Sequence, residues 1–468
     1  MAKRSRRIRA SALVVGVVLA AATVLAAGAE AAVPESPPLR APVYGTDVHE
    51  AGIRNFPDPA LLRAEGRWFA FSSNSTGPAG RNIAVMRSTD LWDWTAPRGD
   101  QPTAEALPHP PSWARSIGQG GSFWAPSVLA VGGHYVLYFA ARHRSVAADR
   151  PGWCIGAARA DSPSGPYTAV DAPVVCRVLG NQQASSTSRS PGAGQGLIDP
   201  FVYRAPNGAP YLLAKGLDRA WQLQGMRLTT DGLRVTGQAH GLLYLEGQTH
   251  TWEYSNQLRF SVMENPAMDY NAAARGSGRP YTLYYSGGEW QSQAYATGYA
   301  TCRTPVGPCT KATTGGAWLR SSRGVAGPGG LTVVRGEGGQ KWVGYHSWAP
   351  DAIAVGEGRR LHVEPLGYRG AAPVLQQRSP RGTFTATSDG PGAVTFAGRA
   401  HDPDTGRPVT VTVREEGVVV ARTTTVGGHF AVTVVDVDPT AHRYYATFRD
   451  DHRAPNTSSP PRDVTLGP

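Results

Sequence analysis

The step Asp199-Pro200 and the strand-like stretch A-P-Y-L-L-A-K-G at 209–216 show the pattern that decides the fold. Five times the chain has a residue-proline step, then an apolar stretch, a turn containing Gly or Asn, and an aromatic-rich strand. The five steps are Asp58-Pro59, Ala125-Pro126, Asp199-Pro200, Asn265-Pro266 and Gly327-Pro328. Their prolines lie 67, 74, 66 and 62 residues apart. Such regular self-similarity indicates a repeat architecture.

Each repeat has the strand content of one propeller blade. Four strands in about 65 residues make a blade, and five blades that close into a ring leave no long open edges. The 56 glycines and 38 prolines are spread along all 468 residues and interrupt most stretches that are long enough for a helix. A β-sandwich with long loops is the alternative, but it would not produce five matched units. We therefore predict an all-β chain whose residues 51–378 form a five-bladed β-propeller.

The character of the sequence changes from about Ser379. Large aromatic residues become rare, and short Thr/Val-rich strands follow one another at close spacing. This pattern predicts a small immunoglobulin-like β-sandwich domain over 379–468, with a flexible tail from Pro455. The stretch H-D-P-D-T-G at 401–406 is interpreted as a turn rather than a calcium loop. Polysaccharide binding and added stability are both open as the role of this accessory domain.

The N-terminal segment has the features of a secretory signal peptide. Five basic residues precede an uncharged run from Ala10 to Gly28, and Ala29-Glu30-Ala31 fits a cleavage site. We predict a signal peptide over 1–31 and a linker over 32–50; an uncleaved membrane anchor is the alternative. The 42 Arg against 4 Lys are typical of a GC-rich bacterial genome. We expect a secreted, extracellular bacterial protein that is not membrane-bound after cleavage.

Charge and cysteine content narrow the function classes. Removing 1–31 lowers the formal charge from +11 to +7, and no run interleaves basic and aromatic residues, so no nucleic-acid partner is expected. The four cysteines are an even number without C-x-x-C spacing, which favours two disulfides over a zinc site. Of three pairings, we predict Cys154–Cys176 and Cys302–Cys309, because each pair lies within one short segment.

Three acidic residues occupy matched positions of separate repeats. Asp58, Asp199 and Glu264 lie at or just before the proline step of repeats 1, 3 and 4. The innermost strands of a propeller line its axis, so these side chains are expected to meet at one end of the channel. One protonated and one ionised carboxyl group suit the hydrolysis of a glycosidic bond. Glu253 is the rival acidic residue, ranked second because it has no neighbouring proline step.

Four ring-bearing side chains are candidate sugar contacts. They are Phe56, Trp124, Trp290 and His346. Aromatic faces can stack on a sugar ring, and an imidazole can hydrogen-bond to its hydroxyls. Packing in the core is the alternative interpretation of each.

The chain from about Asn55 to Gln376 resembles glycoside hydrolase family 43. The order and spacing of six stretches carry the resemblance: N-F-P-D-P (55–59), F-W-A-P-S-V (123–128), L-I-D-P-F-V-Y (197–203), V-M-E-N-P-A-M (262–268), L-Y-Y-S-G-G (283–288) and R-R-L-H-V-E-P-L (359–366). The resemblance implies that Asp58 is the general base, Asp199 tunes and orients the acid, and Glu264 is the general acid. It also implies an inverting mechanism, in which the acid and base stand about 6.5–9.5 Å apart to admit a water.

The sequence departs from this family at a site that bears on metal binding. Many arabinan-cleaving members have a His after G-P-G near a central metal ion, and here Gly330 follows that triplet. We therefore predict no metal ligands and no required cofactor. A structural calcium, with a contribution from His346, is the weaker alternative.

Family activities lead to a specific expectation about the substrate. We expect a monomer that acts on plant-type polysaccharide or oligosaccharide and releases α-L-arabinofuranose from arabinan or arabinoxylan. The Ser/Gly-rich insertion at 180–196, if it walls off one side of the site, favours exo action. A β-xylosidase, an enzyme of the related fructan- and sucrose-cleaving family, and a non-catalytic carbohydrate-binding propeller are the alternatives.

Overall fold

The structure is a computed structural model in which residues 39, 42, 53 and 55–465 are described, with gaps at 75–79, 90, 92–93, 98–103, 120, 148–151, 177–195, 218–222, 245–250, 323, 355–357, 377–380, 402–407, 416–417, 439–440, 450–456 and 460–461. The predicted signal peptide, most of the linker, nearly all of the 180–196 insertion and most of the 401–406 turn lie outside the described residues. Within the described part, no helix is long and apolar enough to cross a membrane.

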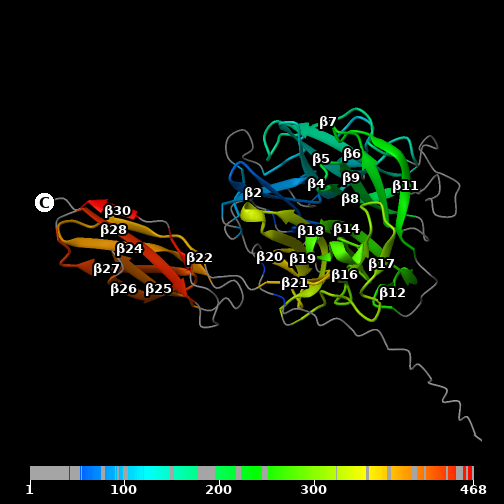
Figure 1. Cartoon of the computed structure of the whole chain (residues 1–468). Helices are drawn as coiled ribbons and strands as arrows, with labels where there is room; N and C mark the ends of the chain where they lie inside the picture. Colours follow the sequence, from blue (N-terminus) through cyan, green and yellow to red (C-terminus); the bar gives the residue numbers. More distant parts are fainter. Residues whose placement is uncertain are drawn as a thin grey trace, which may run out of the picture. The chain divides into compact units, whose positions relative to one another are not determined.

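Five antiparallel sheets follow one another along the first 375 residues (Figure 1). Each is built from consecutive strands: β1 (Ala60–Ala64), β2 (Arg67–Ser72) and β3 (Ala84–Ser88); β4 (Phe123–Val131), β5 (His134–Arg142), β6 (Trp153–Ala160) and β7 (Thr168–Ala169); β8 (Leu197–Arg204), β9 (Pro210–Gly216), β10 (Leu223–Leu228) and β11 (Val235–Leu243); β14 (Met263–Tyr270), β15 (Tyr281–Gly287), β16 (Ala296–Cys302) and β17 (Cys309–Lys311); β18 (Ala326–Arg335), β19 (Lys341–Trp348), β20 (Arg360–Arg369) and β21 (Ala372–Leu375).

Short elements complete the described chain between these sheets. They are the hairpin β12 (Tyr254–Ser255) and β13 (Phe260–Ser261) and the 3-10 turns η1 (Ile117–Gln119), η3 (Ala272–Ser277) and η4 (Glu337–Gly339).

The first strands of the five sheets form a closed ring. β1 contacts β4, β4 contacts β8, β8 contacts β14, β14 contacts β18, and β18 returns to β1. The chain before β1 is tied to the last blade, because the Phe56 N–H donates to the Arg359 carbonyl (2.9 Å) and the Arg359 N–H donates to Asn55 Oδ1 (3.0 Å). The five-bladed propeller predicted from the repeats is confirmed.

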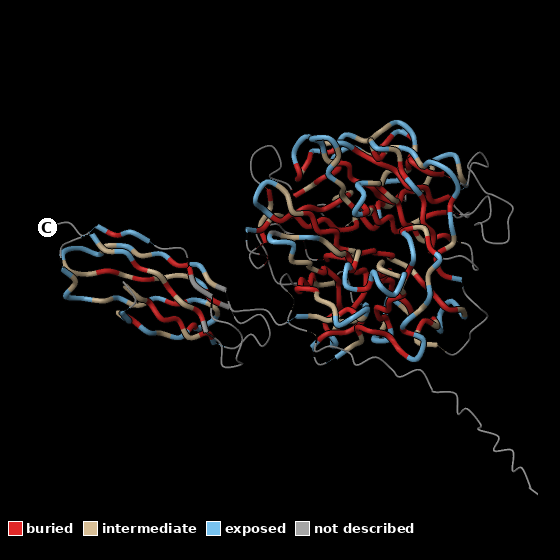
Figure 2. Tube along the Cα trace, viewed as in Figure 1, coloured by how far each residue is buried: buried red, intermediate tan, exposed pale blue. Residues whose placement is uncertain are grey.

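The blades are held together by apolar side chains on both of their faces. β5 illustrates the pattern, because six consecutive residues from Val136 to Ala141 are buried. A strand buried on both faces reads as a continuous apolar run. Buried segments accordingly fill the propeller between its sheets (Figure 2).

The repeated proline steps share an unusual backbone conformation at the ring's axis. Asp58, Ala125, Asp199 and Asn265 have φ of 48°, 47°, 52° and 48°, and with their prolines they line one small cavity. The fifth position in that cavity is Gly330, with φ 62°, followed by Leu331. The sequence predicted the fifth step at Gly327-Pro328, but the residue in the matching position is Gly330, three residues later. Glycine takes a positive φ without a side-chain clash, so this blade needs no proline to mark the step.

Two disulfides lie within the propeller. Cys154 bonds Cys176, and Cys302 bonds Cys309, so all four cysteines are paired as predicted. Each bond joins neighbouring strands of a single blade or its connection, and neither links two blades.

The C-terminal residues form two sheets around a core of their own. One contains β22 (Arg381–Gly382), β23 (Thr385–Ser388), β24 (Ala393–His401) and β27 (His429–Val435); the other contains β25 (Thr410–Glu415), β26 (Val418–Thr424), β28 (Ala441–Arg449), β29 (Thr457–Ser458) and β30 (Arg462–Thr465). Buried side chains from both sheets pack together, which makes this domain a β-sandwich. β29 and β30 pair with β28, so the predicted flexible tail is wrong for those residues. The immunoglobulin-like class stays a prediction.

We expect Phe396→Ala to lower the free energy of unfolding of the C-terminal domain by about 3–5 kcal/mol, because Phe396 is fully buried in its core. The control Val426→Ala, at a side chain that is 83% exposed, should change it by less than about 0.5 kcal/mol. Calorimetry of the full chain measures both. Equal effects of the two substitutions would contradict the assignment of this core.

Candidate active site

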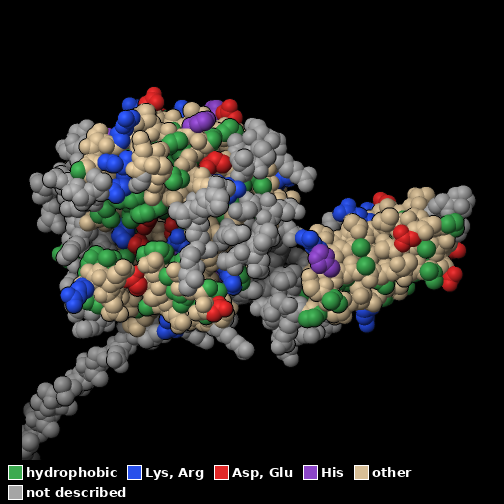
Figure 3. Space-filling model, turned by 180° about the vertical axis from the view of Figure 1, so that it is seen from behind, with side chains coloured by type: hydrophobic (Ala, Val, Ile, Leu, Met, Phe, Trp, Pro, Cys, Tyr) green, Lys and Arg blue, Asp and Glu red, His purple; other side chains and the backbone are tan. Residues whose placement is uncertain are grey.

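A pocket of about 420 Å³ is lined by residues from all five blades. Its lining consists of Asn55, Asp58, Ser73, Asn74, Ser122, Trp124, Ile198, Asp199, Glu264, Asn265, Trp290, Tyr295, Trp348 and Arg359. It shares Asp58, Asp199 and Asn265 with the cavity on the ring's axis. Acidic and basic side chains gather in a hollow of the propeller surface in Figure 3. The three acids predicted from matched repeat positions are therefore brought into one pocket.

Asp58 is held as an acceptor on both carboxylate oxygens. The Ser73 hydroxyl donates to Oδ2 (2.7 Å), and the Asn265 amide donates to Oδ1 (3.4 Å). The same Ser73 oxygen accepts the Ala125 N–H (2.7 Å), which ties Asp58 to the second blade. Both donors are neutral and each oxygen keeps a lone pair, so Asp58 can still accept a proton from water.

His346 holds the backbone of Asp58 through a hydrogen bond. Its Nδ1 accepts the Asp58 N–H (2.9 Å), so the neutral ring carries its proton on Nε2, and that atom has no partner among the described residues. Burial, together with the nearby Arg359 charge, holds the pKa of His346 well below its usual value. A Cβ on Gly330 would lie 2.6 Å from His346 Nδ1. The imidazole thus fills the space beside Gly330, where a larger residue would displace it.

Asp199 is the most buried of the three acids. Burial and the neighbouring charge of Glu264 raise the pKa of Asp199 to about 8, although Lys215 and the Asn265 N–H oppose the rise. A carboxyl in such surroundings keeps its proton at neutral pH, because ionisation would place a second charge beside Glu264 without water.

Both carboxyl oxygens of Glu264 accept hydrogen bonds, one from a cationic donor and one from a neutral donor. The Lys215 ammonium lies 2.6 Å from Oε2, and the Tyr295 hydroxyl donates to Oε1 (2.7 Å). The pKa of Tyr295 is raised well above its usual range by burial and by Glu264, so its hydroxyl keeps its proton and stays a donor. Glu264 is therefore fixed in orientation at the wall of the pocket.

The rival Glu253 lies in a separate cluster. It accepts hydrogen bonds from Tyr285 (2.8 Å) and Lys311 (2.6 Å), it is 3% exposed, and it is absent from the pocket lining. These contacts give Glu253 a structural role and leave Glu264 as the acid of this blade at the pocket.

Three tryptophans line the pocket, and each belongs to a stacked pair. Trp124, 37% exposed, stacks on Trp153 with ring centres 4.1 Å apart. Trp290, 39% exposed, stacks on Trp348 at 6.1 Å, and both rings lie under the guanidinium of Arg359. The two predicted tryptophans are thus available to a ligand.

Two predicted sugar contacts do not reach the pocket. Phe56 is fully buried in an apolar cluster between the first and last blades, and His346 is 1% exposed. Their prediction as substrate-binding residues is corrected: Phe56 packs in the core, and His346 acts on Asp58.

Several polar groups at the site were not predicted from the sequence. Ser73, Asn265, Tyr295 and Arg359 line the pocket, and Lys215 contacts Glu264 without being part of that lining. Most are common residue types without a distinctive pattern around them. Lys215 had a signal that could have found it, because it is one of only four lysines beside 42 arginines.

The described residues gather no cluster of three metal-ligand side chains at the axis. No group of three or more His, Cys, Asp or Glu side chains in the described ranges could hold a metal ion. The His346 Nδ1 lone pair is already used by the Asp58 N–H, and Gly330 contributes no ligand. We therefore derive no chemical step through a metal.

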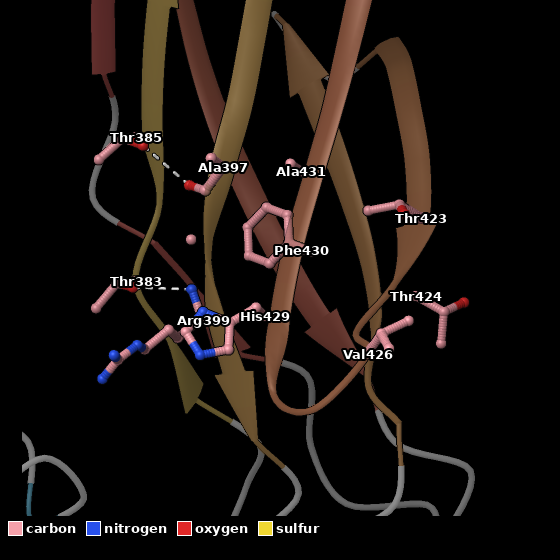
Figure 4. Close-up of a pocket in the computed structure, with 11 residues that line it drawn as sticks. Thr383, Thr385, Ala397, Arg399, Thr423, Thr424, Val426, His429, Phe430 and Ala431 are labelled. Atoms are coloured by element: carbon pink, nitrogen blue, oxygen red, sulfur yellow. Dashed lines mark hydrogen bonds between the residues drawn. The ribbon is translucent and has the colours of Figure 1, made fainter.

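A second groove, of about 800 Å³, lies in the C-terminal sandwich (Figure 4). Part of its polar lining is used internally, because the Thr385 hydroxyl donates to the Ala397 carbonyl and Thr383 Oγ1 accepts the Arg399 N–H, both at 3.0 Å. No carboxylate lines it.

Comparison with known proteins agrees with this geometry. The profile described as Glycosyl hydrolases family 43 matches residues 53–371. No curated protein sequence matches the chain. Three similar solved structures are a thermostable family-43 glycoside hydrolase (22% identity, TM-score 0.54, covering 72% of this chain and 96% of that one), an endo-1,4-β-xylanase from Bacteroides thetaiotaomicron (20%, 0.51, 73% and 97%) and an exo-1,5-α-L-arabinanase from a bovine ruminal metagenomic library (18%, 0.50, 69% and 97%). At these identities the likeness shows the fold.

We expect Asp199→Asn to stabilise the protein above about pH 8 and to lose this advantage below about pH 4. The raised pKa means that folding takes up a proton between the ordinary carboxyl pKa near 4 and the folded value of about 8, so the unaltered protein loses stability as pH rises through that window. Asn imitates the protonated acid and still accepts the Asn265 N–H. Melting temperatures across pH 4–9 measure the difference; a difference that does not vary with pH would contradict the assignment.

Proposed function

The chain belongs to glycosyl hydrolases family 43, and on this premise we propose that it is a secreted, inverting, exo-acting α-L-arabinofuranosidase of arabinan or arabinoxylan. The catalytic groups proposed are Asp58 as general base, Glu264 as general acid and Asp199 as the residue that tunes and orients that acid. The observation that carries the proposal is the meeting of these three carboxyl groups, from three different blades, in one pocket between two exposed tryptophans.

The different surroundings of the acids support a division of roles. Asp58 has only neutral donors on its oxygens, which suits a base that takes a proton from an attacking water. Glu264 then gives its proton to the leaving glycosidic oxygen while the bond to the anomeric carbon breaks. Asp199, which keeps its proton at neutral pH, adds no negative charge to the pocket.

The walls of the pocket support a neutral sugar as substrate. Trp124 and Trp290 offer ring faces on which the apolar face of a pentose can stack. Arg359 and Asn55, hydrogen-bonded to each other, offer donors and an acceptor for hydroxyl groups. A pocket of this size, with aromatic walls and a few polar groups, is typical of a small-ligand site.

Exo action rests on the 180–196 insertion of the sequence, which we propose closes one side of the pocket. Removal of residues 182–194 should then enlarge the released products from a monosaccharide to longer fragments. Unchanged product size after this deletion would refute exo action by that loop.

We expect the protein without its signal peptide to release arabinose from aryl α-L-arabinofuranoside, arabinan and arabinoxylan, and Glu264→Ala to lose about 10²-fold or more of that activity. Asp58→Asn should be similarly inactive, whereas Glu253→Gln is the matched control and should keep activity. Proton NMR should show the inverted anomer as first product. Release of xylose from aryl β-D-xyloside would favour the β-xylosidase; polysaccharide binding by an inactive protein, unchanged in Glu264→Ala, would favour the non-catalytic alternative.

We expect Trp290→Ala to raise KM about fivefold with a smaller change in kcat, because an exposed stacking surface contributes about 1 kcal/mol to binding. The control is Tyr244→Ala, because Tyr244 is an exposed aromatic residue that does not line the pocket. Trp318 is also absent from the pocket lining, but it is buried in the core, so its removal would lower the stability of the protein. Initial rates on an aryl glycoside measure both. Equal KM values for Trp290→Ala and the unaltered enzyme would exclude this contact.

A further inference from the structure

We propose that Lys215 is a positioning residue of the general acid, which it orients and whose carboxylate it stabilises as the proton leaves. This inference rests on the proposed function and adds to it a residue that the family stretches quoted above do not include.

The first support is the geometry of the contact. Lys215 lies on β9, the second strand of its blade, and reaches Glu264 on the inner strand of the next blade, β14. The ammonium is 2.6 Å from Oε2, and the two side chains are 12% and 17% exposed. Tyr295 holds the other oxygen. A short ion pair with this little exposure to water is weakly screened, so it acts strongly on the carboxyl group.

The second support is the choice of residue. The chain has 42 arginines and only four lysines, of which Lys215, Lys311 and Lys341 are in the described part. Each of the three forms an ion pair with a carboxylate on β14 or in the connection before it: Glu264, Glu253 and Asp269. An ammonium is a compact point charge, whereas a guanidinium needs room for a planar fork. In a chain that otherwise uses arginine, lysine at 215 marks a confined single-point contact.

The contact has a direct chemical consequence for acid catalysis. When the glycosidic C–O bond breaks, the Glu264 O–H bond also breaks and its proton moves to the leaving oxygen, which leaves a carboxylate. The Lys215 ammonium already lies beside Glu264 Oε2, so it stabilises the negative charge of the carboxylate as that charge forms, without any rearrangement. Lys215 therefore supports the step in which Glu264 becomes charged.

Lys215→Met tests this role, with Lys215→Arg as the charge-retaining variant and Lys311→Met as the matched control. Lys311 makes the same 2.6 Å contact, but with Glu253 and away from the pocket. In Lys215→Met the alkaline limb of the kcat/KM profile should move upward by about one pH unit, because the variant removes the positive charge that lies 2.6 Å from the Glu264 carboxyl group. Its kcat should fall about tenfold or more on arabinan, and much less on an aryl glycoside whose good leaving group needs little acid assistance.

Each outcome bears on one of the two proposals. Lys311→Met should leave the pH profile in place, and a shift as large as that of Lys215→Met would show a general effect of lost ion pairs and overturn the inference. An unmoved alkaline limb in a folded Lys215→Met enzyme would also overturn the inference about Lys215. If Glu264→Ala is inactive in the same assays, the proposed function still stands. Activity in Glu264→Ala equal to that of the unaltered enzyme would instead reject the proposed function.

The same interaction is measurable without substrate. In protein carrying ¹³C-labelled glutamate, the carboxyl signal that Glu264→Gln removes should titrate at higher pH in Lys215→Met than in the unaltered protein. Titration at the same pH in both would overturn the inference whatever the enzymatic activity.

Discussion

The whole site depends on one backbone constraint. In four blades, the residue at the ring's axis takes the left-handed backbone conformation although it is not glycine. Asp58, Ala125, Asp199 and Asn265 all take it, each before a proline, and Gly330 takes it in the fifth blade. Such conformations cost about 1–3 kcal/mol for residues with a Cβ and persist only where the surroundings enforce them. The apolar faces packed between blades supply that enforcement. As a result, two of the three acids, Asp58 and Asp199, lie on the axis itself.

Placing three carboxyl groups together creates a problem of charge that the protein solves differently for each. Asp58 is held by two neutral donors and by the His346 ring beneath its backbone. Glu264 is paired with the Lys215 ammonium. Asp199, buried beside Glu264, keeps its proton. The three acids therefore meet in one pocket, and each has different partners there.

Much of the fold and part of the site could be predicted from local patterns. The proline steps and aromatic strands identified five blades, and the short spacing within each cysteine pair identified both disulfides. The same reliance on proline misplaced the fifth step, since Gly330 takes the required φ without one. Phe56 and His346 were misassigned because the sequence does not show on which side of the chain a ring packs. His346 meets Asp58 across 288 residues.

The sequence by itself determined the number of blades, their strands and which acids begin them, because these follow from repeats and periodicities within about 70 residues. Only the tertiary structure decided that Lys215 grips Glu264, that Glu253 belongs to another cluster, and that Asp199 holds a proton. Those properties depend on burial and on charges brought within about 3 Å from separate blades. Coulomb energies and desolvation follow distance and exposure in space, and neither is encoded in separation along the chain.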